Sequence, residues 1–116
     1  MKYCAQKWDI QKDEEVATIR PNGCKLDFSN SDEFESLFKG LLDEGYMRVL
    51  IDLRYVTFMD SCMLGILVDG YRKVAGTGEI GLCHVDDNIG NVLELTRLNE
   101  IFNIYKTLED ALLVAA

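Results

Sequence analysis

The segment from Val49 to Gly65 constrains the fold of this chain more than any other stretch of its sequence. It opens with Val49–Leu53, a short apolar run typical of a strand that is covered on both faces. The pattern breaks at Asp60 and Ser61, whose side-chain oxygens can accept hydrogen bonds from the free N–H groups of a first helical turn. Apolar residues then recur at helical spacing: Leu64, Leu67, Val68, Tyr71, Val74 and Ala75. The segment therefore predicts a central strand that closes at Asp60 and a helix that starts with Ser61 and packs on the sheet.

Further helical patterns lie on both sides of this segment. Asn30, Ser31 or Asp32 can cap a helix that Gly45 ends. Its apolar positions fit one helical face completely: Phe34, Leu37, Phe38, Leu41 and Leu42. The elements expected downstream are a strand over 79–85, a helix capped by Asp86, Asp87 or Asn88, a strand over 101–105, and a helix from Thr107 through Ala115.

The N-terminal part of the chain shows strand patterns instead. Tyr3–Ile10 and Val16–Arg20 flank a polar turn and predict a β-hairpin. A turn at Pro21 leads into a short extended piece, Cys24–Asp27. Because strand and helix alternate from residue 31 onward, the sequence predicts an α/β fold: a mostly parallel sheet with an N-terminal antiparallel hairpin and about four helices.

Length and charge narrow the function classes. The chain has 116 residues, of which 48% are apolar by the broad count, so we expect a single domain over 1–116. The formal net charge of -8 disfavours binding to nucleic acid or to an anionic membrane by bulk attraction. The sequence shows neither a basic leader followed by an apolar run nor a stretch near the ~20 apolar residues that cross a bilayer. We expect a cytoplasmic protein with no membrane insertion.

The sequence gives little support for a metal site or for hydrolytic catalysis. The four cysteines, Cys4, Cys24, Cys62 and Cys83, stand singly, and a single histidine could help them hold a metal. We therefore expect free thiols, no metal site and no cofactor. His84 lies within the expected strand over 79–85 and is interpreted as a packed or half-exposed strand residue and not as a catalytic base. An enzymatic function is not expected.

Ser61 is the candidate with the clearest chemistry. It places a hydroxyl at a helix N-terminus, where the macrodipole favours added negative charge, so a phosphoryl group would be accommodated without unfolding. The alternative is a plain structural cap worth on the order of 1 kcal/mol. Asp60 allows a second hypothesis, because phosphoaspartate receiver domains place their acceptor after a central strand. A receiver runs from its first strand directly into a helix and uses paired acids there to hold magnesium, whereas here Asp13–Glu15 lead only into another strand.

At Phe58–Gly65, the sequence FMDSCMLG resembles the D-S-S-G-L-G motif of STAS domains, the fold of bacterial anti-sigma factor antagonists. Leu26-Asp27 resembles the family's G-x-L-D segment, and Arg48–Leu53 resembles the strand before the motif. Leu93–Phe102 resembles L-x-x-x-G-L-x-x-x-F, and Thr107–Leu112 resembles the closing helix. The resemblance runs from about Val16 to the end of the chain and implies a STAS-like fold.

The resemblance implies a phosphorylation-controlled protein–protein switch. The unmodified antagonist binds an anti-sigma factor that is also a serine kinase and thereby frees a sigma factor. The kinase phosphorylates the serine after the motif aspartate, here Ser61, and a metal-dependent serine phosphatase reverses the modification. The residues expected to contact the partner are Asp27, Asp60, Ser61, Cys62, Met63 and Leu64.

Three positions depart from the family pattern. Cys62 replaces a second serine, Met63 replaces a glycine and Arg97 replaces the glycine of L-x-x-x-G-L. Glycine would let a partner's backbone come close, whereas methionine puts a flexible thioether on the first turn of the helix. Two alternatives stay open: a divergent member that is never phosphorylated, and a STAS subunit that docks permanently in a lipid transporter or a stress-signalling assembly.

Overall fold

A five-stranded sheet forms the centre of the molecule in a computed structural model that describes residues 7–114. The strand order is β1-β2-β4-β6-β7, with β1 antiparallel to β2 and every other neighbouring pair parallel. The strands are β1 (Trp8–Lys12), β2 (Val16–Pro21), β4 (Arg48–Asp52), β6 (Glu79–Cys83) and β7 (Asn103–Tyr105). The expected mixed sheet and N-terminal hairpin are confirmed, although residues 3–6 of the first expected strand lie outside the described part.

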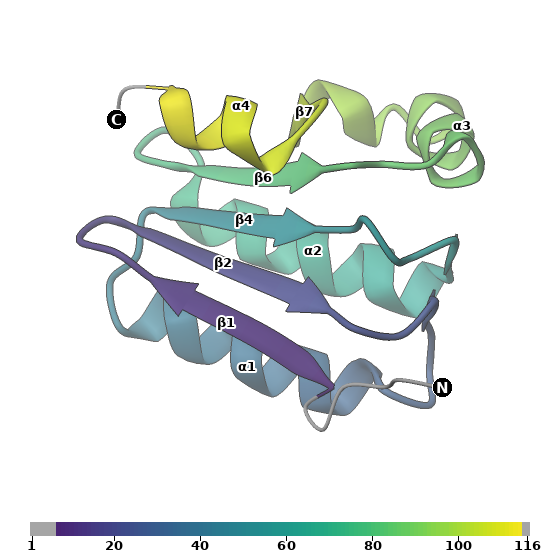
Figure 1. Cartoon of the computed structure of the whole chain (residues 1–116), viewed down its shortest axis with the longest axis horizontal. Coiled ribbons are helices and arrows are strands. Elements are labelled where there is room, and N and C mark those ends of the chain that lie inside the picture. The colour runs from purple at the N-terminus through teal and green to yellow at the C-terminus, as the bar shows by residue number, and fades with distance from the viewer. Residues whose placement is uncertain (1–6, 115–116) are drawn as a thin grey trace.

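Two long helices cover one face of this sheet. Figure 1 shows α1 (Ser31–Asp43) and α2 (Ser61–Val74) side by side behind the strands. Phe34 and Phe38 of α1 are fully buried and stack with their ring centroids 5.5 Å apart. Burying a large apolar side chain of this kind contributes about 1.5–3 kcal/mol. The main core therefore lies between these helices and the strands, as the helical periodicity predicts.

The other face carries a smaller core beneath the C-terminal helix α4 (Leu108–Leu113). Leu50 and Cys83 of the sheet pack there against Ala111. Burial raises the pKa of the Cys83 thiol to about 12, so this cysteine stays protonated and unreactive at neutral pH. Cys24 and Cys62 are also free thiols, while Cys4 lies outside the described residues.

A second, two-stranded sheet changes the expected path of the chain around Asp60. Strand β4 ends at Asp52, and residues 53–57 lead to β5 (Phe58–Met59), which pairs in parallel with β3 (Lys25–Leu26). Asp60 therefore follows a short strand outside the main sheet, and the prediction that it closes the central strand is wrong. This pairing could not be predicted from the sequence, because a two-residue strand has no measurable periodicity.

The remaining helices come before and after β7 in the C-terminal part of the chain. Helix α3 (Asp87–Leu95) is capped by the Asp86 carboxylate, and the Thr107 hydroxyl caps α4. The described chain also contains a short 3₁₀ helix, η1 (Leu98–Glu100), and the last strand begins at Asn103, later than the expected start at residue 101. Within residues 7–114, the helices fall short of the length and apolar content needed to span a membrane.

Arg97 occupies a left-handed backbone conformation, with φ 63° and ψ 17°, at the junction of α3 and η1. Glycine adopts this conformation without steric cost, which explains why the related pattern L-x-x-x-G-L has glycine here. The ion pair between Arg97 and Glu100 is exposed, so it contributes little free energy to offset the cost of this backbone conformation.

We expect Arg97→Gly to raise the free energy of unfolding by roughly 1 kcal/mol in a urea titration, because it relieves this backbone strain. Arg72→Gly is the matched control, since Arg72 lies within α2 and the same change there should destabilise by about 1 kcal/mol. Destabilisation of both variants by equal amounts would contradict the strain argument.

Candidate functional site

Asp60 fixes the start of α2. Its backbone is extended, with φ -94° and ψ 178°, and its Oδ1 accepts a hydrogen bond from the Met63 amide at 3.1 Å. The expected capping role of this segment is therefore confirmed, with Asp60 as the cap and Ser61 as the first helical residue.

The second oxygen of the same carboxylate ties a distant loop to the helix. Oδ2 of Asp60 accepts the Phe28 amide at 3.0 Å, and the Asp60 amide donates to the carbonyl of Leu26 at 3.1 Å. These bonds hold the loop after β3 directly beside the helix start. The structure thus brings Asp27 into one surface region with Asp60 and Ser61, from which it is distant in sequence.

Ser61 is exposed at this helix start. The Asp60 carboxylate occupies the Met63 amide, whereas the amides of Ser61 and Cys62 have no hydrogen-bond partner within residues 7–114. Open amides at the positive end of a 14-residue helix interact favourably with a negative group. An anionic group on the Ser61 side chain would therefore meet free backbone donors.

Hydrogen bonds within its own loop hold the Asp27 carboxylate in place. Its Oδ1 accepts hydrogen bonds from both the amide and the hydroxyl of Ser29. These two bonds hold the pKa of the Asp27 carboxyl below its ordinary value, so it carries a negative charge at neutral pH. The Asn30 side chain accepts a hydrogen bond from the Asp27 amide at 3.0 Å. It therefore makes no capping hydrogen bond to α1, although it is one of the three caps that the sequence allows.

The three residues after Ser61 differ in how far they are exposed to solvent. Cys62 is exposed, with its sulfur 3.8 Å from the Ser31 hydroxyl, and Leu64 is half-buried. Met63 is fully buried in the main core. The expectation that the Met63 thioether lies on the partner-binding surface is therefore wrong. Its position in the first turn places it on the face that packs against the sheet, together with Ile66 and Leu67.

Two exposed aromatic residues beside the site were missed from the sequence. Phe28 is 79% exposed on the loop that Asp60 holds, and Phe58 is 49% exposed on β5. A shallow cleft of about 80 Å³ continues from Phe58 past Leu64 to Val92 of α3. Exposed aromatic residues are frequent anchors of protein interfaces. The only sequence signal was an aromatic residue inside the polar turn that follows Asp27.

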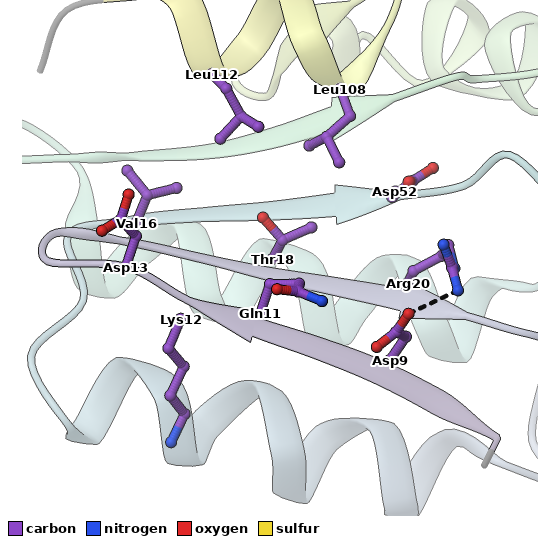
Figure 2. Close-up of a pocket in the computed structure, with 10 residues that line it drawn as sticks. All are labelled: Asp9, Gln11, Lys12, Asp13, Val16, Thr18, Arg20, Asp52, Leu108 and Leu112. Carbon is purple, nitrogen blue, oxygen red and sulfur yellow. Dashed lines mark hydrogen bonds and ion pairs between the residues drawn. The ribbon is translucent and has the colours of Figure 1, made fainter.

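A larger groove lies elsewhere. Figure 2 shows its floor on β1 and β2 and its upper wall formed by Leu108 and Leu112 of α4, with an ion pair between Arg20 and Asp9 along it. Its volume is about 510 Å³, but none of the six expected partner-binding residues lines it. It is not part of the site around Ser61.

The site offers little for metal chemistry. Among the described residues, the structure contains no group of three or more His, Cys, Asp or Glu side chains placed to hold a metal ion. Both oxygens of Asp60 already accept backbone hydrogen bonds. The local chemistry is that of an exposed hydroxyl beside two carboxylates and two aromatic rings.

Comparisons with known proteins test the fold and the family resemblance. The family model described as "STAS domain" matches residues 7–111. A Thermotoga neapolitana protein named as a candidate anti-sigma factor antagonist is 32% identical over 101 residues, which are 85% of this chain and 88% of that protein. The anti-sigma-B factor antagonist of Staphylococcus aureus is 26% identical over 83 residues, covering 71% of this chain and 77% of the relative. The crystal structure of a candidate anti-sigma factor antagonist from Thermotoga maritima superposes with a TM-score of 0.83 at 27% identity, covering 90% of this chain and 91% of that one. The resemblance and fold class expected from the sequence are confirmed.

Proposed function

Because this chain belongs to the STAS domain family, we propose that it acts as an anti-sigma factor antagonist that phosphorylation of Ser61 switches off. In its unmodified form it binds an anti-sigma factor that is also a serine kinase, and so frees a sigma factor. A metal-dependent serine phosphatase restores the unmodified form. The chain itself is a binding module and supplies the acceptor hydroxyl.

The observation that carries this proposal is the exposure of the Ser61 side chain at the start of α2. A kinase needs an accessible hydroxyl, and the open amides of Ser61 and Cys62 would stabilise the phosphate that results. The capping carboxylate of Asp60 holds the backbone on both sides of this hydroxyl. Phosphorylation would therefore leave the fold intact.

The charges around the hydroxyl explain how the modification acts on binding. A phosphate adds about -1.5 to -2 charges at neutral pH. It would do so beside the carboxylates of Asp27 and Asp60, on a chain whose net charge is already -8. The partner surface that fits the unmodified site would then meet a bulky anion, which costs affinity through repulsion and obstruction.

The acceptor site is tested by incubating the protein with its cognate anti-sigma factor kinase, ATP and magnesium, followed by intact mass and peptide mapping. We expect one phosphate per chain in the native protein and none in Ser61→Ala. Ser36→Ala is the matched control, because Ser36 is an exposed serine of α1 and its loss should change nothing. A phosphate mapped to Ser29, Ser31 or Ser36 would contradict the assignment.

Affinity capture separates this role from a permanent docking role. Recovery of a serine kinase of the anti-sigma factor type supports the proposal. Recovery of a transporter ATPase, with no effect of phosphorylation on its binding, would instead identify a constitutive STAS subunit.

A further inference from the structure

His84 lies immediately after β6, at the start of the segment that leads to α3. It has a positive φ of 55°, a conformation that a side-chain-bearing residue adopts at an energetic cost. This turn ends β6 two residues earlier than the sequence predicts and directs the imidazole toward the C-terminal helix. Its Nε2 accepts the backbone amide of Leu108, the first residue of α4, at 3.1 Å.

A second donor converges on the same nitrogen. Nη2 of Arg54 lies 3.4 Å from Nε2 of His84. A guanidinium and a backbone amide are donors only, so Nε2 must carry a lone pair and the ring proton must sit on Nδ1. The position of Arg54 is fixed, because it forms an ion pair with Asp52, whose side chain is 1% exposed.

From this geometry we propose that His84 is a pH-sensitive latch that holds α4 on the sheet only while its imidazole is neutral. A proton on Nε2 removes the acceptor for the Leu108 amide, and it places a second cation against Arg54 and at the positive end of α4. The carboxylates of Asp52 and Glu109 offset part of the repulsion, since both act electrostatically on Arg54. They do not restore the lost acceptor.

Release of the latch would change a defined surface. Helix α4 covers Leu50 and Cys83 and provides Leu108 and Leu112 as one wall of the groove in Figure 2. Within residues 7–114, α4 is also tied to the sheet by the hydrogen bond from Arg48 to the carbonyl of Ala111 at 2.9 Å. Protonation of the imidazole would therefore loosen α4 and reshape this groove. The latch is independent of the role proposed for Ser61.

Hydrogen exchange of the α4 amides tests the latch, with His84→Gln as the comparison. Glutamine keeps an acceptor at the reach of Nε2 but does not titrate, and comparison at equal pH cancels the intrinsic pH dependence of exchange. We expect the ratio of the native protection factors to those of the variant to fall about tenfold between pH 7.5 and pH 5.5. This is the change expected when one hydrogen bond is lost on protonation. A ratio that stays constant would overturn the proposal.

The native protein provides a second readout that needs no variant. The chain has a single histidine, so its imidazole signals in an NMR spectrum are unambiguous. We expect the Nδ1–H tautomer at pH 7.5 and a loss of α4 amide protection that follows the ring titration. An Nε2–H tautomer, or a ring that titrates while α4 keeps its protection, would contradict the latch.

Discussion

Replacing Arg48 with alanine is expected to lower the free energy of unfolding by about 3–5 kcal/mol, because it breaks a buried ion pair from one side. Arg48 and Glu79 have side chains that are only 9% and 11% exposed, and they lie opposite each other on β4 and β6. Without the guanidinium, the Glu79 carboxylate would stay buried with its charge uncompensated. The carbonyl of Ala111 would also lose its donor. Urea unfolding followed by circular dichroism gives the measurement.

Arg72→Ala is the matched control for Arg48→Ala. Arg72 pairs with Asp69 on the surface of α2, with side chains 74% and 54% exposed, and such pairs contribute about 0–1 kcal/mol. Equal losses in the two variants would show that the pair between β4 and β6 adds no more than a surface contact.

The ion pair between Arg48 and Glu79 also determines how acid should change the stability of the native protein. Burial alone would raise the pKa of Glu79, but hydrogen bonds from Asn103, Tyr105 and Arg48 outweigh burial and hold that pKa below its ordinary value. A lowered pKa in the folded state means that this carboxylate stabilises the fold at neutral pH. Its contribution is lost as the pH falls through the folded-state pKa. In Arg48→Ala this part of the acid sensitivity should be diminished.

Ser61→Asp is expected to weaken binding to the proposed anti-sigma factor partner by about a hundredfold, equivalent to about 2.7 kcal/mol. The added carboxylate lies at the N-terminus of α2, which favours negative charge, so the thermal midpoint should change by only a few degrees. Affinity by isothermal titration calorimetry and stability by thermal unfolding separate the two effects.

Ser36→Asp provides the charge control for Ser61→Asp, since it adds the same charge at an exposed position of α1. It should leave affinity within about threefold, because exposed charges away from an interface are screened by salt. A loss of affinity equal to that of Ser61→Asp would mean that net charge, and not the position of Ser61, controls binding. Unfolding of Ser61→Asp would contradict the helix-terminus argument itself.

Periodicity and capping chemistry were sufficient to predict most of the fold. The positions of α1 and α2, the antiparallel hairpin and the parallel sheet follow from patterns that extend over many residues. The exposed Ser61 at a helix start follows from the Asp60-Ser61 pair, which is a strictly local signal.

Features that depend on long-range contacts could not be predicted in the same way. The pairing of β3 with β5 involves two residues on each side, too few for any pattern, yet it determines which loop reaches Asp60. The burial of Met63 depends on which face of the first turn of α2 meets the sheet. The left-handed turn at His84 ends β6 early because its side chain finds partners on Arg54 and Leu108, which are distant in sequence.

The affinity of the anti-sigma factor for this protein with serine and with phosphoserine at position 61, measured under identical salt, tests the central claim most directly. The switch requires binding of the unmodified chain and at least a hundredfold weaker binding of the phosphoserine form, with both forms equally folded. Equal affinities for two equally folded forms would contradict it and leave Ser61 as a helix-starting residue with no regulatory role.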